Sequence, residues 1–470
     1  MVDLSSIVKA YDIRGTVPDQ LNEQTARAFG TAFVQLLRGE GELPRIVVAH
    51  DMREAGPGLV DAFAAGATEL GVDVVHVGLG STDLLYYASG IMDVPGAMFT
   101  ASHNPAEYNG IKLCRSGARP IGQESGLADI RATAERLLSA ASPQAEPGSV
   151  AEPGTAGEPG SVERRDMLAD YAAHLRNLVD LAGNRELTVV VDAGNGMGGY
   201  TVPAVLGDGV LDALPLRIVP LYFELDGTFP NHEANPIDPK NLVDLQAAVR
   251  EHNADIGLAF DGDADRCFVV DERGEAISPS AITALVAARE LAKHPGATVI
   301  HNIITSRAVP EIVAENGGTA VRTRVGHSFI KAEMARTEAV FGGEHSAHYY
   351  FKDFWYADTG MLAAMHVLAA LGEQAGTLSE LAAAYHRYPA SGEINTRVAD
   401  QQAKLIEVKQ AFQDRASIDE LDGLTVDFAD GSWFNLRPSN TEPLVRLNVE
   451  ARDAERMAEL RDEVLALVNS

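Results

Sequence analysis

One arrangement recurs three times along the chain: short apolar runs alternate with Ala- and Leu-rich stretches, and the last run leads into a polar loop. The runs cover residues 44–53, 72–78 and 96–105, then 187–196, 216–223 and 256–266, then 297–304, 319–326 and 338–348. Their β-branched residues predict buried strands, and the stretches between them have helical periodicity. Because right-handed crossovers bring strand carboxyl ends to one sheet edge, where ligands of open α/β sheets bind, the three polar loops are candidate site loops.

The C-terminal part of the chain follows a different pattern. A helix is predicted over 401–415, followed by a strand, a turn at Asp430-Gly431, two strands joined by "RPSNTEP" and an amphipathic final helix, an order typical of an α+β module. Residues 142–163, rich in Pro, Gly and Glu, are predicted to be a linker or surface insertion. We therefore expect an α/β fold class, with mixed-sheet domains at 1–160, 161–275 and 276–387 and an α+β domain at 388–470.

Composition excludes several kinds of protein. Of the 470 residues, 46% are apolar, which is ample for buried cores, and no apolar run reaches the length of a membrane span. The formal charge of −29 disfavours nucleic acid and anionic membranes as partners. The N-terminus lacks the layout of a signal peptide, so we expect a cytoplasmic protein. An anionic ligand would need a local basic pocket, which makes loop arginines informative.

The loop "DGDADR" carries the densest charge. Asp261, Asp263 and Asp265 alternate after a predicted strand, so their oxygens can converge on one hard cation, and without one they would repel each other. An EF-hand is disfavoured, since Arg266 stands where that loop needs glycine and "CFVV" beyond it is strand-like. Two alternatives stay open: a phosphatase with Asp261 as nucleophile, and a solvated acidic turn.

The loop "TASHNPAEYNG" places Ser102 beside His103. Neighbouring side chains diverge in an extended loop, which disfavours a nucleophile–base pair of the Ser–His kind. A cation held by the aspartates could instead bind an oxygen on Ser102, including that of a phosphate carried by the serine. The alternative is a hydroxyl that caps the next helix.

Two further loops offer groups for sugar and phosphate. "RPSNTEP" has the guanidinium, hydroxyls, amide and backbone N–H groups of an anion cradle, although an ordinary hairpin loop is the alternative. In "GEHSAH", Glu344 and Ser346 suit hydrogen bonds to vicinal sugar hydroxyls, whereas a zinc site there lacks any supporting CxxC or HExxH.

The four loops together resemble those of the α-D-phosphohexomutase superfamily, in particular its bacterial phosphomannomutase/phosphoglucomutase branch. "TASHNP", "DGDADR", "GEHSAH" and "RPSNTEP" occur in the family's order and at family-like spacing along the whole chain. The resemblance implies three α/β domains and a C-terminal domain around a central cleft. It also implies interconversion of hexose 1-phosphate and hexose 6-phosphate, of mannose or glucose, through phosphorylated Ser102 and a hexose 1,6-bisphosphate. Ser102 and the three aspartates would bind Mg²⁺.

The resemblance also implies roles for individual residues. Lys112, near Arg14, would take the proton of the attacking hydroxyl, and His103, His327 and His348 are further catalytic candidates. The expected substrate contacts are Tyr11, Arg266, Arg324, Glu344, Ser346, Arg437, Ser439, Asn440 and Thr441. We expect small sugar phosphates as the only partners, with the protein a monomer or a homodimer.

Other functions remain as alternatives at this point. A phosphoglucosamine mutase is disfavoured, because the "GEQSGH" loop typical of those enzymes is replaced here by "GEHSAH". The family often has a lysine near "HNIITSR", where this chain has Ile304, so Arg324 is a candidate replacement for that cleft cation. An aspartate-based sugar phosphatase and a non-enzymatic sensor of cations or sugar phosphates are the remaining alternatives.

Overall fold

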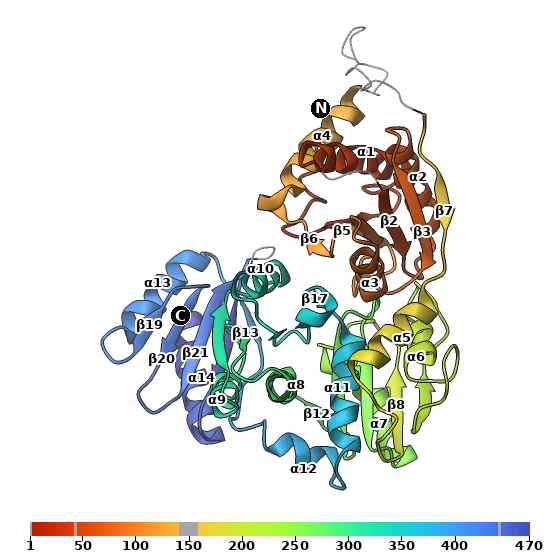
Figure 1. The fold of residues 1–470 in the computed structure, drawn as a ribbon. Helices are drawn as coiled ribbons and strands as arrows, with labels where there is room; N and C mark the ends of the chain where they lie inside the picture. The colour runs from red at the N-terminus through yellow and green to blue at the C-terminus, as the bar shows by residue number, and fades with distance from the viewer. Residues whose placement is uncertain (1, 42–44, 141–157, 440–442) are drawn as a thin grey trace. The chain divides into compact units, whose positions relative to one another are not determined.

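The computed structural model describes residues 2–41, 45–140, 158–439 and 443–470. The chain divides into two compact units (Figure 1). The first contains Met1–Ala276 and His348–Leu378, and the second contains Ile277–Ala347 and Ser379–Ser470. Among the described residues, no helix combines the length and the apolar character needed to cross a membrane.

The first sheet of the first unit has the strand order β1-β5-β4-β2-β3-β7, with β6 beside β5. The strands are β1 (Ile13–Thr16), β2 (Arg45–His50), β3 (Asp73–Leu79), β4 (Gly96–Phe99), β5 (Tyr108–Arg115), β6 (Arg119–Pro120) and β7 (Val162–Arg164). Strands β2, β3, β4 and β7 are parallel, and β5 runs antiparallel to β1 and β4. The sheet is therefore mixed, as the sequence predicted.

Four helices accompany this sheet: α1 (Glu23–Gly39), α2 (Gly56–Thr68), α3 (Thr82–Met92) and α4 (Leu127–Ala140), with the 3₁₀ turn η1 (Gln123–Ser125). Helix α1 is capped by Asn22, whose side chain accepts a hydrogen bond from the N–H of Thr25 in a capping box. Phe29 of α1 and Phe63 of α2 pack with Val48 of β2 in one buried core. Helix α3 contacts β2 and β4, and Thr82 at its N-terminus donates a hydrogen bond to Asp263 of the acidic loop.

The predicted linker is partly ordered into this sheet. Residues 142–157 lie outside the described residues, but β7 at its far end pairs in parallel with β3. Asp73 accepts hydrogen bonds from the backbone N–H and the hydroxyl of Ser161, and these bonds fix the point where the chain joins the sheet. The described end of the segment is thus an edge strand, which a composition-based prediction of a linker did not foresee.

The second sheet of the first unit has the order β12-β11-β10-β8-β9. Its elements are α5 (Leu168–Leu178), β8 (Leu187–Asp192), α6 (Gly198–Val205), β9 (Leu216–Leu221), η2 (Pro239–Leu242), α7 (Val243–His252), β10 (Ile256–Phe260), β11 (Cys267–Asp271) and β12 (Ala276–Ile277). Strands β8, β9 and β10 are parallel, and β11 returns antiparallel to β10. The acidic loop therefore joins two buried strands, and "CFVV" is strand, as expected from the sequence.

The first unit also takes in a later part of the chain. Its elements are β16 (Tyr349–Phe351), η3 (Lys352–Phe354), β17 (Ala357–Asp358) and α11 (Gly360–Gly372). Helix α11 packs against β11, and His348 forms an isolated antiparallel bridge with Arg266 at the end of the acidic loop. This return places His348 beside Arg266, 82 positions earlier in the chain.

The second unit contains three parallel strands in the order β14-β13-β15. The elements are α8 (Pro279–Lys293), β13 (Thr298–Asn302), α9 (Ala308–Glu315), β14 (Thr319–Thr323), α10 (His327–Thr337), β15 (Phe341–Gly343) and α12 (Leu378–Ala383). Strand β15 lies in the run at 338–348, and the polar loop "GEHSAH" follows it as the sequence predicted. After β15, the N–H of Ala347 donates a hydrogen bond to the carbonyl of Glu344 and closes a tight turn. Ala347 has a φ of +65°, in the left-handed region.

The C-terminal module of the second unit is an antiparallel sheet in the order β18-β22-β21-β20-β19. Its elements are β18 (Ile394–Arg397), α13 (Gln401–Phe412), β19 (Ser417–Asp419), β20 (Leu424–Asp427), β21 (Trp433–Pro438), β22 (Leu444–Glu450) and α14 (Ala454–Val468). Phe412 of α13 packs edge-on to Phe434 of β21 in its core. The predicted α+β module is thereby confirmed.

Candidate active site

Ser102 lies in the loop after β4 and is almost completely buried. Its φ of +49° is in the left-handed region, which is unfavourable for a residue with a side chain. The N–H of Ser102 donates to Oγ1 of Thr100 at 2.8 Å, which supports this conformation. The hydroxyl Oγ of Ser102 donates to Oδ2 of Asp261 at 2.7 Å. The structure therefore brings the predicted serine and the acidic loop together across 159 residues of chain.

The expectation that Ser102 and His103 diverge was wrong. Oγ of Ser102 lies 3.2 Å from Nδ1 of His103, because the left-handed serine bends the loop that an extended chain would keep straight. Nη2 of Arg266 also lies 2.6 Å from this Nδ1, so the nitrogen is an acceptor and the proton of the neutral ring is on Nε2. Burial, together with Arg266 and Arg14, holds the pKa of His103 well below its ordinary value.

Asp261 is held on both oxygens. Oδ1 accepts from the N–H of Arg266 at 3.1 Å, and Oδ2 accepts from Nε and Nη2 of the same arginine at 3.0 and 2.8 Å. Burial raises the pKa of Asp261 although Arg266 opposes the rise. The pair of a buried carboxylate and a buried guanidinium thus orients the acceptor of the Ser102 hydroxyl.

Asp263 and Asp265 are bound by a lysine. Nζ of Lys112, on β5, donates to Oδ2 of Asp263 at 2.8 Å and to Oδ2 of Asp265 at 2.5 Å. Burial lowers the pKa of Lys112, but the two carboxylates outweigh it and raise that pKa well above the ordinary value. In this arrangement Lys112 is an ammonium donor, and its role as acceptor of the proton of the attacking hydroxyl stays a prediction.

The acidic loop has the donor set of a cation site. One ligand atom each of Asp261, Asp263 and Asp265 lies within 4.8 Å of the others, and all three residues are buried. Oδ1 of Asp263 and Oδ1 of Asp265 are buried without a hydrogen-bond partner among the described residues. Unbonded carboxylate oxygens in a buried cluster fit a hard, oxygen-binding cation such as Mg²⁺.

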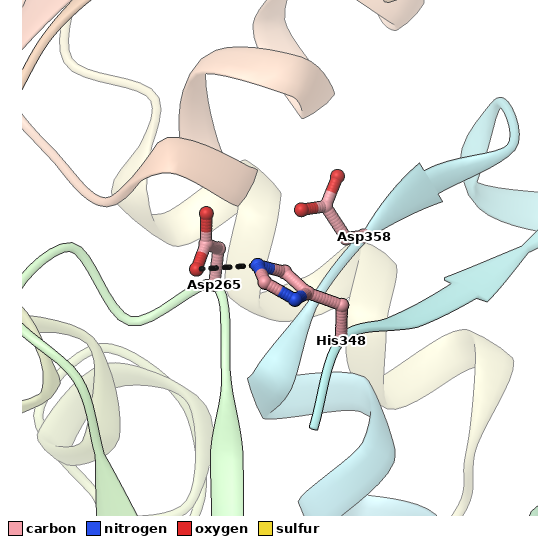
Figure 2. A group of neighbouring side chains, drawn as sticks. All are labelled: Asp265, His348 and Asp358. Atoms are coloured by element: carbon pink, nitrogen blue, oxygen red, sulfur yellow. Dashed lines mark ion pairs between the residues drawn. The ribbon is translucent and has the colours of Figure 1, made fainter. Parts of the chain in front are cut away.

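Asp265 also belongs to a second group of possible ligands. Figure 2 shows the ring of His348 lying between Asp265 and Asp358, with Nε2 of His348 3.7 Å from Oδ1 of Asp265. His348 is stacked on Tyr350, with ring centroids 6.3 Å apart. The predicted catalytic candidate His348 thus lies next to the acidic loop, in the same compact unit.

The N-terminal candidates approach the same loop. Nε of Arg14 donates to Oδ2 of Asp12 at 2.7 Å, and Nη1 donates to Oδ1 of Asn104 at 2.5 Å, two residues after the serine. Burial lowers the pKa of Arg14, but Asp12 outweighs it and the net shift is upward. Tyr11 is half-buried close to Gly122.

The remaining candidates belong to the second unit. Glu344 is buried and accepts hydrogen bonds from Nδ2 of Asn302 at 3.2 Å and from the N–H of Gly326 at 3.1 Å. Ser346 follows in the tight turn, and both it and His327, the first residue of α10, are half-buried. Arg324 is exposed, with its guanidinium 4.5 Å from the ring centroid of Phe329.

The expected phosphate cradle is described only in part. Nη2 of Arg437 donates to Oε2 of Glu393 at 2.9 Å, and the N–H of Ser439 donates to the carbonyl of Leu444 at 2.9 Å. Asn440 and Thr441 lie outside the described residues. Within the described part, Arg437 and Ser439 are at the end of β21, at the mouth of the hairpin loop.

Sequence reasoning missed three residues that support the first-unit site. Oγ1 of Thr82 donates to Oδ2 of Asp263 at 2.6 Å, Asp83 is buried beside it, and the side chain of Arg53 binds the backbone of the serine loop. The dipeptide Thr82-Asp83 resembles an ordinary helix start, and "HDMR" an ordinary strand end. Their polar character was the only available signal.

The fold and this site define a class of protein: a multidomain α/β protein in which a buried serine hydroxyl meets a carboxylate triplet, an arrangement suited to phosphoryl transfer. Models of four domains match along the chain, described as phosphoglucomutase/phosphomannomutase alpha/beta/alpha domain I (5–140), domain II (169–274), domain III (278–388) and C-terminal domain (393–467). The chain belongs to the phosphoglucomutase/phosphomannomutase family. It is accordingly a phosphohexomutase, an isomerase that acts as an intramolecular phosphotransferase.

Similarity to known members extends over the full chain. A phosphomannomutase of Salmonella montevideo is 40% identical over 469 residues, and 98% of each chain is covered. Phosphohexose mutases of Xanthomonas campestris pv. campestris are 41% identical over 464 residues, with 97% of this chain and 98% of theirs covered. A crystal structure of a family protein from Burkholderia thailandensis has a TM-score of 0.86 at 32% identity, covering 99% of this chain and 97% of its own.

Proposed function

We propose that this protein interconverts the 1-phosphate and the 6-phosphate of a hexose, mannose or glucose, with Ser102 as the phosphoryl carrier. The observation that carries the proposal is the 2.7 Å hydrogen bond from Oγ of Ser102 to Asp261, which joins the serine loop to the acidic triplet. Relatives named phosphomannomutase and phosphohexose mutases, at about 40% identity, support the substrate class.

The proposed reaction has two phosphoryl transfers. In the first, the bond between phosphorus and Oγ of Ser102 breaks while a bond forms to a hydroxyl oxygen of the sugar monophosphate. The product of this step is a hexose 1,6-bisphosphate. In the second, the phosphoryl group at the other end of the sugar returns to Oγ, which restores the phosphoserine. Such transfers depend chiefly on positioning and on neutralisation of charge.

The described residues have distinct tasks in this scheme. Arg266 orients Asp261 and His103, and Arg14 holds Asn104 of the serine loop. Lys112, whose Nζ contacts Asp263 and Asp265, would take the proton of the attacking hydroxyl, and His348, which lies beside Asp265, is a second candidate for this task.

Asp261, Asp263, Asp265 and an oxygen on Ser102 would hold the cation, for which we propose Mg²⁺. When bound, Mg²⁺ would neutralise negative charge on the transferring phosphoryl group. The bisphosphate would also serve as the activator that phosphorylates Ser102.

The second unit would hold the substrate. Glu344 and Ser346 would bind the 3- and 4-hydroxyls, which lie nearly symmetrically between C1 and C6, so that one grip serves both orientations of the sugar. The expected phosphate cradle of Arg437, Ser439, Asn440 and Thr441, with Arg324, would bind the phosphate remote from the reaction. The expected domains 1–160, 161–275, 276–387 and 388–470 would each contribute one loop.

Replacing Ser102 tests this proposal. In Ser102→Ala the phosphoryl acceptor is absent, so we expect turnover of glucose 1-phosphate and mannose 1-phosphate to fall at least about 1,000-fold, since a covalent step is lost. A coupled assay with a trace of hexose bisphosphate measures this. Intact mass of the wild-type protein should show about 80 Da of added phosphate that Ser102→Ala lacks.

Ser161→Ala is the matched control, because Ser161 is exposed and its hydroxyl donates to Asp73 of β3. Near-normal turnover of Ser102→Ala would end the proposal. Release of inorganic phosphate by Ser102→Ala, lost on Asp261→Asn, would establish the phosphatase alternative instead.

A further inference from the structure

Both terminal nitrogens of the Arg53 guanidinium bind the backbone of the serine loop. Arg53 follows β2, and its side chain is only 2% exposed. Nη1 donates to the carbonyls of Pro105 and Tyr108, both at 2.8 Å. Nη2 donates to the carbonyls of Ser102 at 3.0 Å and Asn104 at 2.6 Å. One buried cation thus binds four backbone carbonyls within seven residues of the loop.

The loop needs such support because its central residue is strained. The φ of +49° at Ser102 costs about 1 kcal/mol or more for a residue other than glycine. The carbonyl of Ser102 also faces Gly262 so closely that a Cβ there would lie 2.4 Å from it. The carbonyl is therefore confined between Nη2 of Arg53 and the acidic loop, and this fixes the direction of Oγ toward Asp261.

The contacts require an arginine in this position. A guanidinium offers five donors in a rigid plane, whereas a lysine has three donors on one nitrogen and cannot span four carbonyls. The cation is anchored on its other side by Asp51, whose Oδ1 accepts from the N–H of Arg53 at 2.9 Å and whose Oδ2 lies 3.3 Å from Nε.

Arg53 also contacts the domain that carries the acidic loop. The guanidinium of Arg53 lies 5.1 Å from the ring centroid of Phe229, and a Cβ on Gly227 would come within 2.9 Å of Cα of Arg53. Residues from the segment before α7 therefore cover Arg53, so its position depends on the same part of the chain that carries the acidic triplet.

We propose that Arg53 is a positioning residue for phosphoryl transfer: its guanidinium holds the carbonyls of Ser102, Asn104, Pro105 and Tyr108 and so aims the Ser102 hydroxyl at the acidic triplet. This inference rests on the proposed role of Ser102. Arg53 itself touches no reacting atom, and its effect is transmitted only through the backbone of the loop.

Arg53→Gln and Arg53→Lys test the inference. Loss of the four hydrogen bonds from Arg53 should displace Oγ of Ser102 by a fraction of an ångström or more, and misplacement of this order costs about 100-fold in rate. We expect kcat of Arg53→Gln to fall about 100-fold while KM stays within about threefold, since no substrate contact is removed. Phosphorylation of Ser102 by hexose 1,6-bisphosphate, followed by intact mass, should slow by the same factor.

Arg176→Gln is the control. Arg176 also binds three backbone carbonyls, those of Val205, Gly207 and Asp212, but far along the chain from the serine loop. It should lower the thermal midpoint as Arg53→Gln does and leave kcat unchanged. Equal kcat losses in both variants, or kcat of Arg53→Gln within threefold of wild type, would overturn the inference.

Arg53→Lys keeps the buried charge opposite Asp51, so it remains measurable where Arg53→Gln is too unstable to purify. Arg53→Lys should fold and still lose at least about tenfold in kcat, because one ammonium cannot replace the two guanidinium nitrogens that bind the four carbonyls. Full turnover of Ser102→Ala would contradict the proposed function. Inactive Ser102→Ala together with fully active Arg53→Lys would contradict only the present inference.

Discussion

At the scale of single residues, the site depends on buried polar groups that hydrogen bonds from neighbouring elements hold in place. Asp83 is completely buried at the start of α3, and its Oδ2 accepts hydrogen bonds from Tyr171 at 2.7 Å and from Thr359 at 2.6 Å. Burial raises the pKa of Asp83 to about 6, although the hydroxyls of Ser81, Thr359 and Tyr171 oppose the rise and Asp265 adds to it.

Asp83→Asn should therefore change how stability depends on pH. The unfolded carboxyl ionises near 3.8 and the folded one near 6, so the folded state binds more protons in between. Stability contributed by this group is complete below about pH 4 and declines as pH rises through about 6, by roughly 3 kcal/mol. The amide stays neutral, so we expect Asp83→Asn to lack this decline, as measured by urea unfolding from pH 4 to 7.

Asp83→Ala is the matched control for that series. It also removes the charge but loses the hydrogen bonds to Tyr171 and Thr359, so it should be less stable than Asp83→Asn at every pH. An unfolding free energy of Asp83→Asn that falls between pH 4 and 6 as steeply as that of the wild type would show that Asp83 is not the group responsible.

At the scale of elements, helices α1 and α2 meet through glycines. A Cβ on Gly30 would lie 2.1 Å from the carbonyl oxygen of Phe63, and one on Gly66 would lie 2.2 Å from that of Arg27. Neither helix can take a side chain there without separating from its neighbour, which would disturb the core above β2. Periodicity predicted the helices, but the need for glycine at the crossing comes from their partner.

Gly30→Ala should destabilise the protein by about 1–3 kcal/mol through overpacking, against the usual gain of alanine over glycine within a helix. Gly39→Ala, in the same helix with no atom within 4 Å of the added Cβ, should instead be neutral or stabilising by up to about 1 kcal/mol. Thermal unfolding of the two variants decides between these outcomes. An equal shift in both would mean that the helices separate freely at the crossing.

At the scale of the whole molecule, the charge of −29 acts on every part of the chain. Like charges on a compact surface repel each other, and salt screens them over about 10 Å at 0.1 M. We expect the thermal midpoint to rise by a few degrees between about 10 and about 200 mM NaCl.

KCl at equal ionic strength should act as NaCl does, because screening depends on charge and concentration. A rise that occurs with one monovalent cation and is absent with the other would indicate specific ion binding. A midpoint that falls with both salts would show that attractive ion pairs dominate over the general repulsion.

Much of this architecture is readable from the sequence because it depends on local patterns. Apolar runs with flanking polar residues predicted the strands, and the alternation of carboxylates predicted the acidic loop. The polar loop after β15 was expected, but the left-handed Ala347 in its turn was not, since periodicity does not register backbone dihedrals.

Residue types and their order along the chain were sufficient to predict the repeated strand–loop units, to identify the serine and acidic loops, and to recognise the family. The tertiary structure alone decided that His103 turns toward Ser102, that Lys112 binds two carboxylates as an ammonium, and that Arg53 supports the serine loop. Those contacts depend on backbone dihedrals and on carbonyls brought together by the fold, and neither is encoded in the side chains of any one segment.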